Sequence, residues 1–200
     1  MKKRIYQFTN LPIYQIRQIV PPELCFTCDV CCRFPEKDSF LAPYFTPDEI
    51  NAAETINPPL FPFIKGGLRG ILTKGERGRF NSGCKITLIP YKEGYICPAF
   101  DTLTAHCKLY HVRPIDCMLY PFAIMWDADG KEIVLGLDTK CPYIREHMED
   151  QKLKDASLEI ASAIESSPLL DVFSANTGLI GPYQDDVIPL VILKGLTSIF

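Results

Sequence analysis

The chain has 200 residues, 47% of them hydrophobic, which suits one domain of ordinary size with a packed core and argues against a chain that is disordered throughout. Its 24 acidic and 21 basic residues leave a net charge of −3, which gives no reason to expect a nucleic-acid partner. The nine cysteines are the one unusual feature of the composition, and their meaning depends on the compartment.

The start of the chain has the basic residues of a signal peptide, but the stretch after Gln7 is interrupted by polar residues and Pro12, so no unbroken apolar segment follows. The longest late apolar run, 187–193, is far shorter than the ~20 residues of a membrane-spanning helix. We interpret it as a buried strand or the core face of a terminal element. We therefore expect a cytoplasmic protein with no membrane partner, in which thiols stay reduced. The odd number of cysteines also fits a fully paired disulfide framework poorly, which leaves metal ligation as the common explanation.

The first elements follow from proline positions and capping residues. Residues 4–20 should form an extended or mixed segment that ends at Pro21 and Pro22, and a tight loop should follow over 25–32. The run Thr46-Pro47-Asp48-Glu49 predicts a helix start, because threonine can cap, proline suits the first helical position and glutamate completes a capping box. This helix should end near Thr55.

Glycines dominate the stretch from Gly66 to about Pro90, where 71–73 and 86–89 are short strand candidates. A second hairpin is better defined, with strands over 122–126 and 132–137 joined by the turn Asp127-Ala-Asp-Gly.

The stretch 144–166 contains no glycine or proline and is roughly compatible with one apolar helical face, which predicts a long helix. From these elements we predict an α+β fold. Residues 1–143 would form a small irregular domain, organised by metal, with short strands, hairpins and helices. Residues 144–200 would form a helical C-terminal extension packed on it.

The strongest signal is the run Cys25-Phe-Thr-Cys28-Asp-Val-Cys31-Cys32. The C-x-x-C spacing lets two thiolates turn back on one metal, as in zinc ribbons and iron–sulfur loops. The triple spacing is that of bacterial ferredoxins, in which a distant Cys-Pro completes the ligand set. Two such pairs occur here, Cys97-Pro98 and Cys141-Pro142. Because adjacent Cys31 and Cys32 tend to point apart, we expect one of them to serve a different centre from its neighbour.

We predict eight metal ligands and leave Cys84 open. The eight are Cys25, Cys28, Cys31, Cys32, Cys97, Cys107, Cys117 and Cys141. Nine thiols allow two four-thiolate sites and a spare, or one such site and a more open second one, and spacing alone does not group them. The expected cofactor is an iron–sulfur cluster, [4Fe–4S], or zinc. The ferredoxin-like spacing and the Cys-Pro pairs favour the cluster slightly, although all-thiolate sites serve both metals.

The same residues carry a resemblance to a known family. The cluster at 25–32, the later Cys97-Pro-Ala-Phe and the block Cys107-x-x-Tyr-x-x-Arg-Pro-x-x-Cys117-x-x-Tyr-Pro resemble the CxxCxxCC cysteine-cluster family. These YkgJ-like proteins are described as zinc- or iron-chelating domains, and the resemblance covers about residues 22–143. It implies chelation of iron or zinc. A related branch includes a flagellin lysine N-methylase thought to depend on an iron–sulfur cluster, so the resemblance also admits an enzyme. The chain departs from the family in 61–96 and beyond 143.

Other residues near the block allow two interpretations. Arg113 either offsets the negative charge of the thiolates or pairs with a surface acid. His106 and His111 flank Cys107 and could ligate zinc or an open position on iron, but with so many thiols available we favour roles at the surface or beside the ligands. The leading function is a metal-chelating protein. The rivals are an iron–sulfur enzyme, for electron transfer or lysine N-methylase-like protein modification, and a protein for metal storage or delivery.

Overall fold

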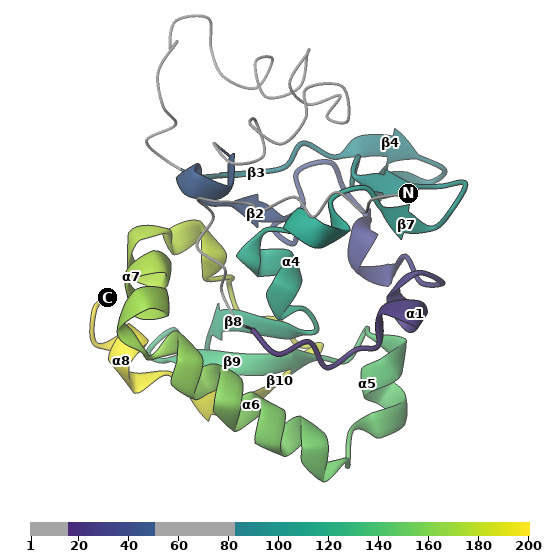
Figure 1. Ribbon diagram of the computed structural model, residues 1–200. Helices are drawn as coiled ribbons and strands as arrows, with labels where there is room; N and C mark the ends of the chain where they lie inside the picture. Colours follow the sequence, from purple (N-terminus) through teal and green to yellow (C-terminus); the bar gives the residue numbers. More distant parts are fainter. Residues whose placement is uncertain (1–15, 51–82) are drawn as a thin grey trace, which may run out of the picture.

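The computed structural model describes residues 16–50 and 83–200, and it has the α+β architecture that the sequence predicts (Figure 1). Short antiparallel sheets form an upper half of the molecule as drawn. A longer three-stranded sheet and most of the helices form a lower half, and the short helix α4 (Ile115–Leu119) lies between the two.

The lower half is built on a three-stranded antiparallel sheet in the order β10-β9-β8. Its strands are β8 (Phe122–Trp126), β9 (Ile133–Asp138) and β10 (Val187–Ile192). The first two strands form the predicted hairpin. Asp127 closes its turn by accepting hydrogen bonds through Oδ1 from the backbone N–H groups of Lys131 (2.7 Å) and Glu132 (3.1 Å). The run 187–193 supplies the predicted strand, but within β10 only Val187 is buried.

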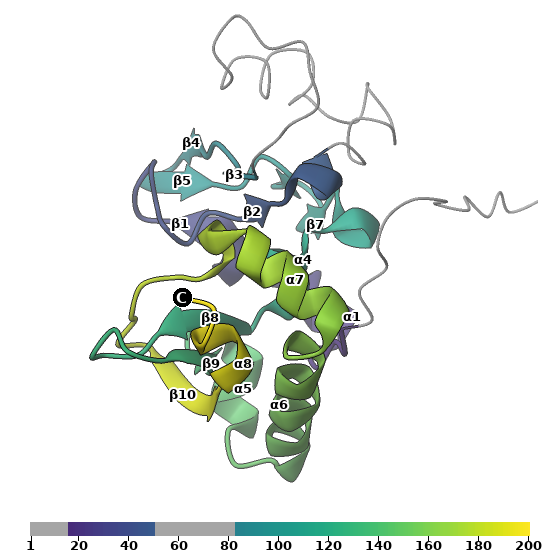
Figure 2. The same ribbon diagram turned by 90° about the vertical axis from the view of Figure 1, so that its left-hand side faces the viewer.

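Helices cover one face of this sheet, as Figure 2 shows. They are α5 (Pro142–His147), α6 (Gln151–Ile164), α7 (Ser167–Ala175) and α8 (Lys194–Thr197). Because side chains alternate along a strand, Ile133, Leu135 and Leu137 join the main core beneath the helices, whereas Val134 faces a smaller cluster on the other side. A further short turn, η4 (Thr177–Leu179), leads from α7 towards β10.

The prediction of one helix over 144–166 is wrong, because the chain forms two helices, α5 and α6, separated by 148–150. Asp150 causes the break. Its backbone is extended and its side chain accepts a hydrogen bond from the N–H of Lys152 (3.1 Å), so it caps a new helix instead of continuing the old one. The division into domains at 143 stays a prediction. The main sheet spans that boundary, since β10 pairs with β9.

The upper half consists of very short elements. Its helical turns are α1 (Pro22–Cys25), η1 (Val30–Cys32) and η3 (Tyr110–Val112). Its strands are β1 (Arg33–Phe34), β2 (Tyr44–Phe45), β3 (Cys84–Lys85), β4 (Ile89–Tyr91), β5 (Gly94–Ile96), β6 (Phe100–Asp101) and β7 (His106–Cys107). They pair as β1-β5-β4, β2-β3 and β6-β7. A small separate core lies among them, with Phe34, Ala42, Leu88, Cys97, Ala99 and Leu109 as its buried members.

Of the predictions for this half, the helix start is confirmed. Residues 47–50 are helical, and Thr46 and Glu49 form the capping box through reciprocal hydrogen bonds of 2.9 and 3.3 Å. The strand expected over 86–89 begins only at Ile89. The strand at 71–73, most of the segment 4–20 and the helix end near 55 lie outside the described residues.

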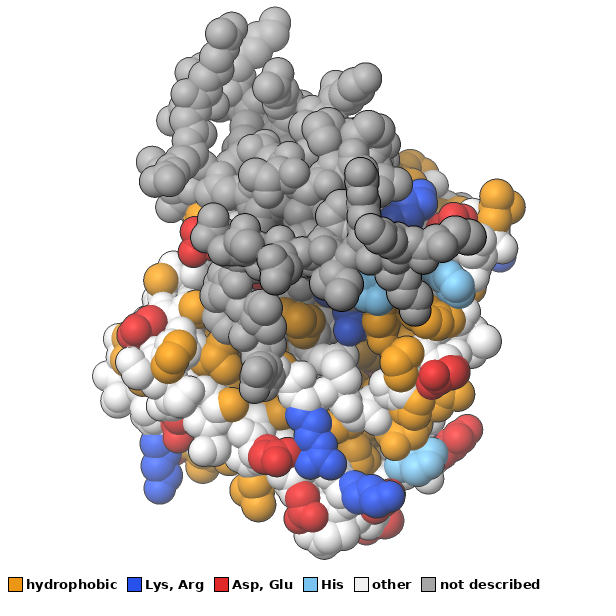
Figure 3. Space-filling view, viewed as in Figure 1, with side chains coloured by type: hydrophobic (Ala, Val, Ile, Leu, Met, Phe, Trp, Pro, Cys, Tyr) orange, Lys and Arg blue, Asp and Glu red, His pale blue; other side chains and the backbone are white. Residues whose placement is uncertain are grey.

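The visible surface mixes charges of both signs. In Figure 3, basic and acidic side chains alternate over the lower part of the face, where α5 and α6 lie. In the described parts of the chain, no helix has the length and apolar character needed to cross a membrane.

Candidate metal centre

A cavity of about 1060 Å³ lies between the two halves, and all eight cysteines predicted as ligands line it. They are Cys25, Cys28, Cys31, Cys32, Cys97, Cys107, Cys117 and Cys141. Cys84, which the sequence left open, lies in β3 and is not part of the lining. The volume is at the upper end of the roughly 300–1,000 Å³ of small-molecule sites, so the cavity has room for more than one ion.

The early cysteines reach the cavity from a tightly wound segment. Cys25 ends α1, Cys28 follows in the loop, and Cys31 and Cys32 lie in η1. Backbone hydrogen bonds from Cys28 N to Cys25 O (3.4 Å) and from Cys32 N to Asp29 O (2.9 Å) produce the successive turns. The tight loop that the spacing predicts is therefore present.

The later cysteines come from four separate elements. Cys97 follows β5, Cys107 lies in β7, Cys117 lies in α4, and Cys141 precedes the first turn of α5. The N–H of Cys97 donates a 2.8 Å hydrogen bond to the carbonyl of Cys32, so the early cluster and the later block are in direct contact. All nine cysteines are free thiols.

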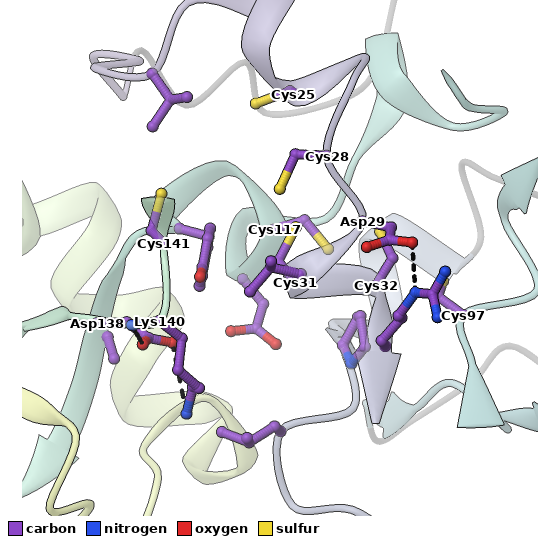
Figure 4. Close-up of a pocket in the computed structure, with 18 of the residues that line it drawn as sticks. Cys25, Cys28, Asp29, Cys31, Cys32, Cys97, Cys117, Asp138, Lys140 and Cys141 are labelled. Atoms are coloured by element: carbon purple, nitrogen blue, oxygen red, sulfur yellow. Dashed lines mark hydrogen bonds and ion pairs between the residues drawn. The ribbon is translucent and has the colours of Figure 1, made fainter. Parts of the chain in front are cut away.

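Figure 4 shows how the labelled cysteines share the cavity. Cys141 lies at the left and Cys32 and Cys97 at the right, while Cys31 and Cys117 lie between them with Cys28 and Cys25 above. In the described ranges 16–50 and 83–200, no three Cys, His, Asp or Glu side chains converge on a position where one ion could sit.

The protein environment holds most of these thiols in the neutral form. Burial is the main cause that raises the pKa of Cys25 to about 11 and that of Cys97 to about 12, and neighbouring sulfur atoms add to both shifts. Burial also raises the pKa of Cys117 well above its ordinary value, with Asp116 adding to the shift. These thiols become thiolates only when a cation is at hand to stabilise them, as metal binding requires.

Cys31 and Cys32 both line the cavity. The interaction of the two adjacent thiols is the main cause that lowers the pKa of Cys31 and raises that of Cys32, and the expectation that they serve different centres stays a prediction. The short η1 turn keeps both side chains at the cavity. Cys31 is exposed, and it is part of the cavity lining.

Arg113 faces the cysteines, which agrees with the first of its two interpretations. Its guanidinium lies 4.0 Å from the centre of the Tyr110 ring, and Nη2 donates to Oε1 of Gln18 (3.0 Å). Its positive charge lowers the pKa of Cys31 and opposes the upward shifts of Cys25 and Cys107. No ion pair between described residues includes Arg113.

Two buried polar atoms in the cavity wall have no hydrogen-bond partner among the described residues. They are Nε of Arg113 and the hydroxyl of Tyr120. Charges at Asp138, Cys31 and Cys141 lie close enough to the Tyr120 hydroxyl to raise its pKa, although burial is the larger cause. Both atoms are donors beside thiols, as expected of groups that stabilise thiolate ligands.

Two buried carboxyl groups fix the start of α4, the helix that carries Cys117. Oε1 of Glu49 accepts a 2.6 Å hydrogen bond from the N–H of Ile115, while its Oε2 completes the capping box. Oδ2 of Asp116 accepts a 2.8 Å bond from the N–H of Tyr44. Burial raises the pKa of Glu49, and it raises that of Asp116 to about 6. The capping box was visible in the sequence, but the bond from Glu49 to a residue 66 positions away was not.

The histidines near Cys107 are not part of the cavity lining. The His106 ring lies 4.5 Å from that of Phe26, and the His111 ring meets the edge of Tyr110 at 5.6 Å. These contacts agree with their interpretation as residues other than ligands.

No family model, no curated protein and no solved structure matches the chain. The similarity to the CxxCxxCC family therefore stays a prediction from the motif.

Proposed function

We propose that the protein binds metal through the eight cysteines of the cavity, and that an iron–sulfur cluster of the [4Fe–4S] type is the favoured occupant. The observation that carries this proposal is that eight free thiols, from residues 25 to 141, line one cavity while the ninth does not. Thiolates are the preferred ligands of iron–sulfur clusters and of zinc.

The surroundings of the thiols support the same proposal. Four thiolates around a zinc ion or a cubane leave a local charge of about −2, so a cation and hydrogen-bond donors beside them are stabilising. Arg113 and the Tyr120 hydroxyl supply these groups in the cavity wall. Neither atom has a hydrogen-bond partner among the described residues, which is a cost that bound thiolates would remove.

Anaerobic purification of the full chain, followed by analysis of iron, zinc and acid-labile sulfide with a visible spectrum, tests the proposal. A brown protein with iron and sulfide in equal amounts supports the cluster. A colourless protein with stoichiometric zinc supports metal binding but refutes the cluster. A folded protein that takes up neither metal refutes the proposal as a whole. Cys84→Ser is the matched control, because Cys84 is not part of the cavity and its loss should leave the metal content unchanged.

A second candidate function is a cluster-dependent enzyme, for electron transfer or for protein modification of the lysine N-methylase type. The cavity volume of about 1060 Å³ favours it, because that volume leaves room for another molecule beside a metal centre. Replacing Cys28 with serine separates the two functions. A structural centre would lose mainly stability, whereas a catalytic centre would lose turnover in protein that stays folded. Storage or delivery of metal would instead show weak, exchangeable occupancy.

A further inference from the structure

We infer that the eight cysteines divide into two sets of four, and that each set closes on its own metal centre when metal binds. The α1 group is Cys25, Cys28, Cys31 and Cys141. The β7 group is Cys32, Cys97, Cys107 and Cys117. This inference rests on the proposed function and adds the number of centres and their ligands.

Backbone pairing holds three members of the β7 group together. Cys97 N donates to Cys32 O at 2.8 Å. Cys107 pairs in the β6–β7 ladder with Phe100, and Phe100 follows Cys97 by three residues. All three cysteines belong to the small core of the upper half. Their relative positions are thus fixed by the fold of that half.

Cys117 completes the β7 group from α4. Its side chain lines the cavity that Cys32, Cys97 and Cys107 also line, and Cys97 and Cys107 add to the upward shift of its pKa. Cys97 and Cys117 likewise add to the upward shift of the pKa of Cys32. Glu49 and Asp116 hold the start of α4 against the upper half, so Cys117 is presented to this group by buried hydrogen bonds.

The α1 group combines the first turns of the described chain with the start of α5. The sulfur neighbours of Cys25 are Cys31, Cys141 and Cys28. Those of Cys141 are Cys28 and Cys31. Cys141 belongs to the main core of the lower half, whereas Cys32, Cys97 and Cys107 of the β7 group belong to or pack against the small core of the upper half. The α1 group is therefore tied to the lower half through Cys141, and three members of the β7 group are held by the upper half.

Cys31 lies between the groups and neighbours members of both. Two observations assign it to the α1 group. It continues the spacing of three from Cys25 and Cys28, which winds one loop around one centre. Its neighbour Cys32 is already joined to Cys97 by a backbone bond.

Arg113 supports two adjacent negatively charged centres. It neighbours Cys25 and Cys31 of the α1 group and Cys107 of the β7 group. One guanidinium can thus face both centres, and its flat face is held by the Tyr110 ring. The Tyr120 hydroxyl lines the same cavity, and Cys31, Cys141 and Cys28 of the α1 group add to the upward shift of its pKa, so we assign it to that group.

Metal content of the wild-type chain and of cysteine variants tests this grouping. The wild type should bind about two zinc ions, or about eight iron and eight sulfide ions in two clusters. Cys25→Ser, Cys141→Ser, Cys97→Ser and Cys107→Ser should each lose half of the metal, and Cys84→Ser should lose none.

Double variants give the decisive comparison. Cys25→Ser with Cys141→Ser, both in the α1 group, should keep half of the metal, whereas Cys25→Ser with Cys97→Ser should lose nearly all of it. A wild-type content of one centre would overturn the grouping, and so would a within-group double variant that binds nothing while circular dichroism shows it folded. Either result leaves the proposed function standing. A wild-type chain that binds no metal refutes the function itself, so the two failures are distinguishable.

Discussion

Tyr120→Phe removes a buried hydroxyl that has no hydrogen-bond partner among the described residues. An unpaired buried polar group costs about 1–3 kcal/mol, and phenylalanine keeps the shape of the ring while removing that cost. The metal-free variant should therefore be more stable than the wild type by about this amount. For a protein of this size ~1 kcal/mol shifts Tm by about 2–4 °C, so we expect a rise of about 2–12 °C.

The metal-loaded protein should respond in the opposite direction. With metal in the α1 group, the hydroxyl has thiolate sulfur as an acceptor, and a hydrogen bond to a charged group is worth about 1.5–3 kcal/mol. The variant would then be less stable than the wild type when both are loaded. Thermal unfolding of the reduced chain, measured with a chelator and after reconstitution, gives both numbers.

Tyr183→Phe is the matched control, because Tyr183 is 43% exposed and its hydroxyl can bond to water. It should change Tm little in either state. A Tyr120→Phe variant that is less stable than the wild type without metal, or that shifts equally in both states, would refute the role of the hydroxyl as a thiolate partner.

Three further variants test the surroundings of the cavity. Burial raises the pKa of Glu49 in the folded protein above its ordinary value of 4.5. The stability that the protonated carboxyl group contributes is therefore complete below about pH 4.5 and is lost as the pH rises through the raised pKa. Denaturant unfolding of Glu49→Gln at a series of pH values should lack this loss, and a pH profile equal to that of the wild type would contradict the prediction. Arg113→Met should weaken metal binding about tenfold or more in a competition assay with a chromophoric chelator, whereas Arg145→Met, on the exposed side of α5, should not. Gly94→Ala would place a Cβ 2.7 Å from the carbonyl oxygen of Phe34 across the β1–β5 ladder. The variant should therefore have a free energy of unfolding lower by ~1–3 kcal/mol and a reduced metal content. A variant as stable as the wild type would show that the ladder adapts.

Local patterns predicted those parts of the structure that local interactions determine. Two short apolar runs on either side of the turn at Asp127 predicted the hairpin of β8 and β9, because strand pairing across a short turn and the chemistry of that turn involve only residues close in the sequence. The capping box at Thr46 was found for the same reason. The break before α6 was missed although its signal is present. An aspartate can lie within a helix or cap the start of a new one. Because the stretch lacks glycine and proline, the capping role of Asp150 was not predicted.

The candidate site was predictable as a set of residues but not as a geometry. Spacing identified the eight cysteines that reach the cavity, because thiols in that pattern have few other uses. Spacing alone did not divide the cysteines into sets, because that division depends on long-range contacts. Examples are the backbone hydrogen bond from Cys97 to Cys32 and the packing of Cys141 in the core of the lower half. The roles of Glu49 and Tyr120 were hidden for the same reason, because both become apparent only when distant segments are packed together.

The unequal build of the two halves explains why metal would matter to this fold. In the lower half, β8, β9 and β10 have five or six residues each and share a large core with four helices. In the upper half no described strand exceeds three residues, and the buried core has six members. Sheets this short have little stability of their own. A thiolate-bound metal contributes about 10–16 kcal/mol of apparent binding energy in zinc-finger peptides, which is comparable with the whole stability of a domain.

The β7 group joins four elements of the upper half and its border, so its centre would act as a cross-link where the hydrophobic core is smallest. The α1 group would then join the first described turns to the lower half through Cys141. On this reasoning, loss of metal from the β7 group should expose the amides of β1, β5 and β7 to hydrogen exchange while β8 and β9 stay protected. Uniform exchange across both halves would contradict it.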